Sequence, residues 1–436
     1  MTVKSLLEGL ADGDRVSDLQ NRLEDIPDEL EQLFAKILHG LKGRYFDDAA
    51  RLFRMHRTVS TPPTVLNLSF ADEDDAESLR RRPVGALAAQ ERFIRSLTMK
   101  RRLNARCRGL LEIGGSHHGK GAITVWDTRD LDELLQKSDY EDSEIMEKLA
   151  EFGQVLADCH VQYLHQSVKD CLQEPEVWAA ILDATRSAPD PAAALCISYL
   201  HQMKTMELGR VMSDERGEFL WLLELFFESA VSLPSYNTGL YIEMIDLLDE
   251  TASLVASAPC YHGTATSLVE KVWGLPACHW VSITNGAKQT DTLLTFAVRH
   301  NFLTLLRHKL QNSSLDVMAL SALLHAAVSP KTLANKGVRL PDLDRETAKK
   351  MGMVLPSAPN VAILRLLLSH GADPDVKIGS ESSTQCLWQR LRQTHRDHNA
   401  ELHDALQGAM PLFKDWARQR YSIGKLRTQT MRVFGS

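Results

Sequence analysis

Residues 159–172, C-H-V-Q-Y-L-H-Q-S-V-K-D-C-L, join a strand-like half to a helix-like half. In the first half the side chains alternate between two faces, and one face carries Val161 and His165. In the second half the apolar residues have helical spacing, and Ser167 with Asp170 three residues later fits a capping box. A histidine between a strand and a capped helix can present its imidazole to a phosphate, although the same arrangement also closes an ordinary small α+β domain. His165 is therefore the candidate phosphate-binding residue.

A second candidate is the glycine-rich run at 114–121, G-G-S-H-H-G-K-G, which satisfies the pattern G-x-x-x-x-G-K. A phosphate-binding loop of this kind needs a Ser or Thr after the lysine, for Mg²⁺, and then a helix whose N-terminus faces the phosphates. Here Gly121 follows Lys120, and residues 122–126 are rich in β-forming side chains. We expect a turn between two strands and not a nucleotide site.

Four side chains near the strand–helix junction are of metal-binding types: Cys159, His160, His165 and Cys171. Strand alternation puts His160 and His165 on opposite faces, and the spacing fits no metal motif. His117 and His118 are adjacent on the glycine-rich turn and offer no better geometry. We expect no metal site.

One helix-forming segment is strongly basic, with Lys100, Arg101, Arg102, Arg106 and Arg108. In a DNA-binding winged helix such a helix enters the major groove. The cluster is local, no aromatic residue lies around it, and the chain has a net charge of −7 with a pI near 6.2. We favour a solvated helix face or a surface for another domain over nucleic-acid binding.

Length and composition indicate a multidomain protein without a membrane span. The 436 residues are 44% hydrophobic and 25% charged, as in ordinary soluble proteins, and suffice for about two to four domains. Seven cysteines without a C-x-x-C pair indicate reduced, mostly buried thiols. The most apolar run, at 219–233, is too short to cross a bilayer and contains Glu224 and Glu228. We expect a cytoplasmic protein that does not bind membranes.

The first part of the chain has the element order of a winged helix. Helices are predicted at about 30–41, 46–56, 64–70, 86–107 and 143–157, and strands at 109–113 and 122–126. The acidic run at 72–75 and the basic run at 80–82 are expected on an exposed loop and helix face. We assign residues 26–172 to a winged-helix-like domain with an insertion at about 114–158, preceded by short helices in residues 1–25.

The rest of the chain reads as a helical connector and a repeat array. Residues 173–256 predict helices at 176–184, 191–206, 218–232 and 237–256, divided by Pro189, Gly217 and Pro234. Within residues 257–419, the segments 292–297 and 322–327 stand where an ankyrin unit has T-P-L-H-x-A. Matching second helices are predicted at 303–310 and 361–370, with an insertion at about 329–359. Residues 420–436 form a basic tail.

Several patches resemble one family. Residues 23–41, 108–113 and 161–172 are similar to the region that follows the NACHT domain in filamentous-fungal signal-transduction NTPases. These are the STAND or NLR-like proteins linked to non-self recognition and programmed cell death. Residues 3–10 and 18–22 resemble the end of the NACHT module itself, and the ankyrin-like units fit the sensor arrays of such proteins.

The resemblance implies a regulatory and sensor half without its motor. A working member of the family has a P-loop, a Walker B acid and sensor residues before this region, and the sequence given begins after them. The resemblance also implies that His165 contacts the β-phosphate of ADP, which requires a NACHT domain in cis or in trans.

We therefore predict a mainly α chain: a winged-helix domain with a small β-wing, a helical connector and an ankyrin-like helical repeat array. The expected function is non-catalytic, with no cofactor of its own and a protein partner bound through the repeats. One alternative is a nucleotide-regulated STAND ATPase whose P-loop half lies outside this sequence. Another is a winged-helix DNA-binding protein that uses the basic helix.

Overall fold

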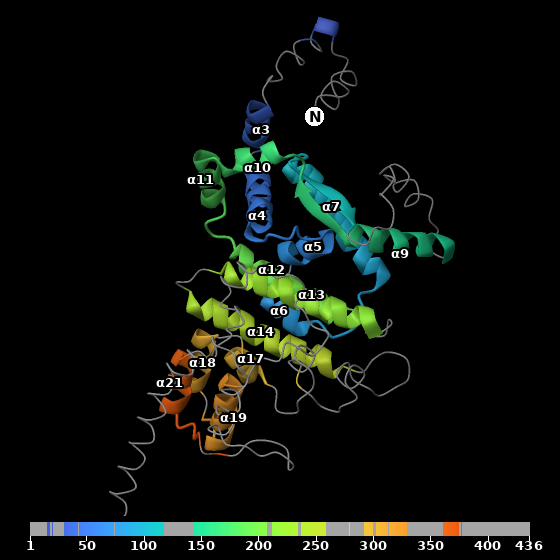
Figure 1. Ribbon diagram of the computed structural model, residues 1–436. Coiled ribbons are helices and arrows are strands. Elements are labelled where there is room, and N and C mark those ends of the chain that lie inside the picture. The colour runs from blue at the N-terminus through green and yellow to red at the C-terminus, as the bar shows by residue number, and fades with distance from the viewer. Residues whose placement is uncertain are drawn as a thin grey trace, which may run out of the picture. The chain divides into compact units, whose positions relative to one another are not determined.

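The computed structural model describes residues 15–17, 20, 30–41, 43–73, 75–116, 143–206, 212–233, 237–258, 279, 292–299, 302–312, 314–328, 361–374 and 376. Over these residues the chain is mainly helical, as predicted, and it contains one small sheet of two strands (Figure 1). Its contacts divide it into two compact units, and each is described by itself. Unit 1 comprises residues 1–207 and 228–233, and unit 2 comprises residues 208–227 and 234–436.

Some predicted segments lie outside the described residues. They are nearly all of residues 1–25, residues 117–142 with the predicted strand at 122–126 and most of the glycine-rich run, the insertion at 329–359, and residues 377–436 with the basic tail.

Unit 1 is built mostly from short amphipathic helices. Those predicted from the sequence are present, with ends displaced by a few residues. The elements are α3 (Leu30–His39), α4 (Arg44–Thr58), α5 (Val65–Glu73), α6 (Ala76–Arg81), α7 (Ala89–Cys107), β1 (Leu111–Ser116), α9 (Ser143–Ala157), β2 (Cys159–Tyr163), α10 (Gln166–Gln173), α11 (Pro175–Ala184) and α12 (Pro191–Lys204).

The centre of unit 1 is formed by α5 and α12. Seven of the nine residues of α5 and twelve of the 14 residues of α12 are buried, so both helices are enclosed on nearly all sides. Asp190 caps α12 by accepting hydrogen bonds from the amides of Ala192 and Ala193. At the other end the buried Lys204 donates to the carbonyl oxygens of Leu79 and Arg82, at 2.8 and 3.0 Å. Lys204 thereby stabilises the C-terminus of α6, where a cation is favourable.

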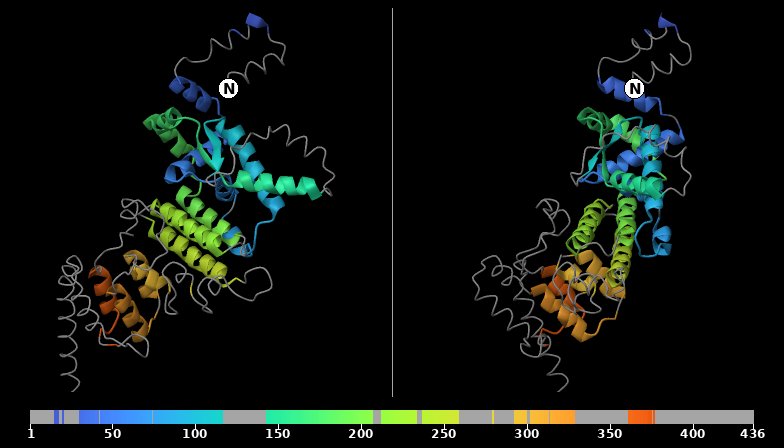
Figure 2. Two further views of the ribbon diagram at one scale, coloured as in Figure 1. Left: turned by 45° about the vertical axis from the view of Figure 1, so that its right-hand side comes forward. Right: turned by 90° about the vertical axis from the view of Figure 1, so that its right-hand side faces the viewer.

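Helices on both sides of the predicted domain limit at residue 172 pack together in unit 1. Both α4 and α10 contact α11, and α12 packs on α4, α5 and α6 (Figures 1 and 2). Arg54 of α4 donates to the carbonyl and hydroxyl oxygens of Thr185, just after α11. Arg57 lies over the ring of Trp178, 3.9 Å from its centre.

The small sheet joins two segments that are distant in sequence. β1 and β2 pair antiparallel, with Ile113 opposite Val161 and an irregularity before Ser116. On its other edge β2 forms an isolated antiparallel bridge, His160 with Thr64, just before α5. β2 therefore lies between the bridge at Thr64 and β1.

Unit 2 consists of helical pairs. Residues 212–227 of α13 (Met212–Val231) belong to it, with α14 (Thr238–Ser257), α17 (Leu293–Arg299), α18 (Leu303–Asn312), α19 (Val317–Val328) and α21 (Val361–Ser369). α17 packs on α18 and on α19, while α21 packs on α18 and on α19. The rings of Phe227, Phe296 and Phe302 form one cluster, with centroids 5.6 to 5.9 Å apart.

Gly217 does not divide the helices as expected. α13 begins at Met212 and continues through Gly217. A single glycine costs a helix about 1 kcal/mol relative to alanine, and this is too little to stop a helix that is otherwise stabilised.

The contact between α7 and α9 depends on a glycine. A Cβ added at Gly153 of α9 would lie 2.9 Å from the Cβ and 3.0 Å from the Cα of Phe93 in α7. The neighbouring Phe152 also meets the ring of Phe93, edge to face at 6.1 Å. The two helices approach this closely because residue 153 has no side chain.

Replacing Gly153 with alanine should destabilise unit 1. Alanine normally favours a helix interior by up to about 1 kcal/mol over glycine. Here the new methyl group collides with Phe93, so we expect a net loss of roughly 1–2 kcal/mol. Hydrogen exchange of peptides from α7 and α9 at increasing urea measures this loss.

Gly239 of α14 provides the matched control. A Cβ there would lie 3.6 Å from Asn237 Oδ1, an ordinary contact, so Gly239→Ala should be neutral or slightly stabilising. Equal stabilisation by both substitutions would contradict a tight contact between α7 and α9.

Candidate functional site

His165 lies at the junction between β2 and α10, exposed to solvent. The strand ends at Tyr163, and His165 is the N-cap of α10: its Nδ1 accepts the amide hydrogen of Ser167 at 3.1 Å. Ser167 was expected to cap this helix, and that expectation is wrong. The hydroxyl of Ser167 instead lies 3.0 Å from the same Nδ1.

The cap determines which ring nitrogen of His165 can donate. Because Nδ1 accepts a backbone N–H, the hydrogen-bond network assigns the proton of the neutral ring to Nε2. Protonation of Nδ1 would remove the cap. The junction thus offers an exposed Nε2–H donor at the start of a helix, where the backbone dipole also favours an anion.

β2 is held to α4 and to the segment before α5 by two further histidines. His56 of α4 lies 2.9 Å, through Nε2, from the carbonyl oxygen of Val161. His160 lies 2.6 Å, through Nδ1, from the carbonyl oxygen of Pro62. These contacts fix the strand that leads to His165. Sequence alternation did not indicate them, because a partner outside the strand leaves no periodic signal.

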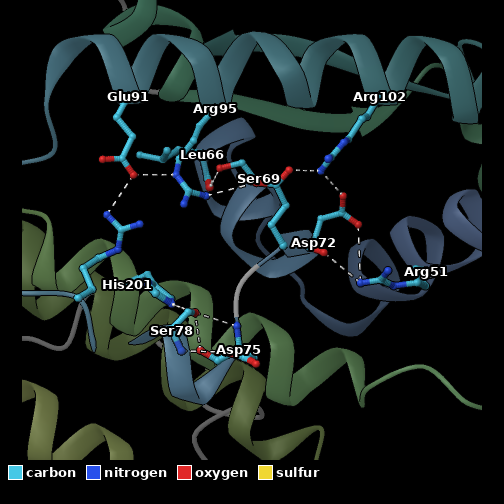
Figure 3. A network of polar contacts seen from close by, with 12 residues as sticks. Arg51, Leu66, Ser69, Asp72, Asp75, Ser78, Glu91, Arg95, Arg102 and His201 are labelled. Atoms are coloured by element: carbon cyan, nitrogen blue, oxygen red, sulfur yellow. Dashed lines mark hydrogen bonds and ion pairs between the residues drawn. The ribbon is translucent and has the colours of Figure 1, made fainter. Parts of the chain in front are cut away.

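A network of ion pairs connects α4, α5 and α7 in unit 1 (Figure 3). Its centre is Asp72, whose side chain is only 5% exposed. Arg102 of α7 pairs with Asp72 at 2.8 Å, Arg51 of α4 at 3.7 Å, and Arg106 at 3.8 Å. Arg106 also pairs with Asp48 of α4 at 3.1 Å. Asp72 was expected on an exposed acidic run, and that expectation is wrong.

The network continues toward α6 and α12. Glu91 accepts from Arg95 and from Arg82, each at 3.1 Å (Figure 3). The guanidinium of Arg95 lies over the ring of Phe70, 4.5 Å from its centre. His201 of α12 stacks on the same ring of Phe70, with centroids 5.0 Å apart.

Two residues of the basic cluster of α7, Arg102 and Arg106, form ion pairs in this network. Arg102 and Arg106 pair with acids of their own chain, so neither is available as a bare charge for a DNA backbone. Arg108 is the left-handed C-cap of α7, with φ of 48°, and a Cβ at Gly40 would meet its guanidinium at 3.1 Å. The signal that could have indicated the network is the spacing of Arg95, Arg102 and Arg106, which lie on one face of the helix.

The described cysteines are structural in character. Cys107, Cys159, Cys171 and Cys196 are buried, and no disulfide joins them. Burial raises the pKa of Cys159 to about 11 and also raises the pKa of Cys107 and of Cys196. Thiols of this kind are poor nucleophiles at neutral pH.

Other kinds of site have little support in the described part of the chain. No group of three or more His, Cys, Asp or Glu there has the geometry to hold a metal ion. No helix among the same residues is long and apolar enough to cross a membrane. A small depression in unit 1 is lined by Arg51, Arg54, Met55, Pro189 and Pro191. His117, His118 and Lys120 lie outside the described residues.

Comparison with known proteins identifies one domain. Residues 41–213 match a family described as a domain of unknown function, DUF7791. The matched segment begins just before α4, ends in the first turn of α13, and contains both His165 and the Asp72 network. No curated protein and no solved structure matches the chain.

Replacing Asp72 with asparagine should strongly destabilise unit 1. The change removes the carboxylate that three arginines share, although Arg102 keeps its pair with Glu73 and Arg106 its pair with Asp48. Because the arginine side chains are 23 to 28% exposed, we expect a loss of roughly 2–4 kcal/mol, somewhat less than for a fully buried pair. Hydrogen exchange of α5 and α7 at increasing urea measures the loss.

Asp183→Asn is the control for this substitution. Asp183 pairs with Arg186 at 2.5 Å, but both side chains are at least 70% exposed. The expected change is below about 0.5 kcal/mol. If Asp72→Asn is as mild as this control, the network does not stabilise the contact between α4, α5 and α7.

Proposed function

We propose that the chain is a non-catalytic regulatory and sensor component of a NACHT-type, NLR-like system in the cytoplasm. In this proposal unit 1 contains a winged-helix domain and unit 2 an ankyrin-like array. The array binds a protein partner, and the output is non-self recognition or cell-death signalling.

The observation that carries the proposal is the order of elements around β2. Along the chain come α4, the bridge residue Thr64, α5, the short additional helix α6, α7, β1 and, after α9, β2; in space β2 lies between Thr64 and β1. Apart from α6, a winged helix has the same order: a first helix, a short strand, two more helices and a hairpin whose last strand pairs with the first. α9 and the residues before it would then be an insertion in the wing.

Two of the segments that carry the resemblance to NACHT-associated regions lie in the same part of the chain, whereas residues 3–10, 18–22 and 23–41 lie before it or at its start. The segments at 108–113 and 161–172 fall within the matched domain at 41–213. They form β1 with the turn before it, and β2 with α10.

Packing in unit 2 supports the ankyrin-like interpretation. α17 with α18 forms one helical pair and α19 with α21 forms another; α17 contacts α19, and α18 contacts α21. Stacking of first helices on first helices and second on second is how such arrays bury a continuous core. Thr292 and Thr295 cap the start of α17 reciprocally, with hydrogen bonds of 2.7 and 3.3 Å.

The turn after α21 is tied back to α19. Gly371 adopts a φ of 98°, which ends the helix in the left-handed region. Asp373 then donates its amide hydrogen to the hydroxyl of Ser321 at 2.8 Å, and Nε2 of the buried His325 lies 3.0 Å from the carbonyl oxygen of Val376. His325 stands at the histidine position of T-P-L-H-x-A, so the motif has a structural role in this unit.

Within the proposal, the Nε2–H of His165 donates to a nucleotide phosphate held by a NACHT domain, in cis or in trans. The test uses a purified NACHT domain, fused to the chain or supplied separately, and follows ADP dissociation. We expect the chain to slow dissociation about tenfold, the effect of one hydrogen bond to a charged group. His165→Asn should abolish this effect, because asparagine caps the helix equally well but has no imidazole.

Two results would contradict this proposal. If the His165→Asn chain slows ADP dissociation as much as the wild-type chain does, His165 does not contact the nucleotide. ATP hydrolysis by the purified chain alone would contradict the non-catalytic role.

Replacing His325 with alanine should loosen the turn at 371–376. The substitution removes a buried side chain and its hydrogen bond to Val376, so local opening should become easier by about 1–3 kcal/mol. Hydrogen exchange of a peptide spanning 371–376 measures this opening. Arg365→Ala, an exposed site on α21, is the control and should leave exchange unchanged.

A further inference from the structure

β2 has an unusual partner on its edge toward α5. The amide of Val161 donates to the carbonyl oxygen of Pro63 at 2.9 Å, next to the bridge between His160 and Thr64. In an antiparallel pair of this kind the two opposed residues exchange both hydrogen bonds. The carbonyl of Val161 should therefore accept from the N–H of residue 63. Residue 63 is proline and has no N–H to give.

The imidazole of His56 occupies the place of the missing amide. Its Nε2 lies 2.9 Å from the carbonyl oxygen of Val161, and its ring packs on Tyr163 with centroids 4.3 Å apart. Its other nitrogen, Nδ1, is buried and has no hydrogen-bond partner among the described residues. The ring therefore fits as a neutral imidazole that donates from Nε2.

The charges around His56 oppose its protonation. Lys169 of α10 acts on the ring, and Arg57 follows it on α4, with its guanidinium over Trp178 of α11. Tyr163 of β2 is uncharged at neutral pH, since burial raises its pKa to about 12. No carboxylate is bonded to the ring among the described residues. Burial lowers the pKa of His56 most, the hydrogen bond to Val161 raises it in part, and Lys169 lowers it again, so the pKa lies below its ordinary value of 6.5.

We propose that His56 is a pH-sensitive latch that holds β2 to α4. Uptake of a proton drives the ring out of its position against β2, and the carbonyl of Val161 loses its donor. Pro63 cannot replace that donor, so the end of β2 and the His165-capped start of α10 separate from α4. The latch operates whether or not His165 contacts a phosphate, so it does not rest on the proposed function.

The direction of the pH response follows from linkage. The pKa of His56 is lower in the closed form than in an open form, where it approaches 6.5. The closed form is thus fully favoured above pH 6.5. It loses up to about tenfold in relative population for each pH unit below 6.5, until the pH passes the pKa of the closed form.

Hydrogen exchange of the full chain tests the latch. Peptides covering residues 161–168 are compared at pH 7.5 and pH 5.5, with rates corrected for intrinsic exchange. In the wild type we expect protection to fall at the lower pH, by at most about tenfold. His56→Gln keeps an N–H donor that does not titrate. In this variant the protection of the same peptides should differ less than twofold between the two pH values.

Two more variants separate the latch from a generally destabilised fold. Pro63→Ala restores a backbone N–H opposite Val161, and it should reduce the pH response although His56 is intact. His165→Asn removes the other imidazole of this segment and keeps a capping side chain, so a pH response that remains in this variant comes from His56. An unchanged response in both His56→Gln and Pro63→Ala, or no response in the wild type, would overturn the proposal.

Discussion

The buried carboxylate of Asp72 is the interaction on which the architecture of unit 1 depends. It brings guanidinium groups from α4 and α7 to the C-terminal end of α5. A buried charge is strongly unfavourable alone, and it is tolerated here because three cations surround it. Thr64 precedes α5, and β1 follows α7 after the turn at Arg108 and Gly109, whose φ values are 48° and 86°. The helices held by Asp72 therefore also carry both neighbours of β2.

This arrangement explains how an exposed residue can have a defined geometry. Among the described residues His165 forms its hydrogen bonds within its own junction, yet the strand before it is fixed by β1, by Pro63 and by His56. A side chain placed by such a framework loses little freedom when it binds a ligand. The same framework would serve a nucleotide contact or a contact with a protein.

The sequence predicted local structure well and tertiary polar contacts poorly. Helices such as α4 and α12 have periodic apolar residues and clear end signals, and they were found within a few residues. Gly217 was expected to end a helix, but the low helix propensity of one glycine is too small an effect to interrupt α13. Asp72 was misjudged because a run of acids looks solvated until its arginine partners, about 20 to 30 residues away, are brought near. The cap of α10 was assigned to Ser167 because histidine is a rare cap, and only coordinates show its Nδ1 accepting.

The buried thiols give the protein internal reporters of its own opening. Cys159 begins β2, and Cys196 lies in the middle of the enclosed helix α12. A maleimide cannot reach either sulfur until the surrounding packing separates. Separation of β1 from β2 alone would expose Cys159, whereas exposure of Cys196 requires the helices at the centre of unit 1 to unfold. The order in which the two are alkylated thus distinguishes partial opening from global unfolding, without any introduced label.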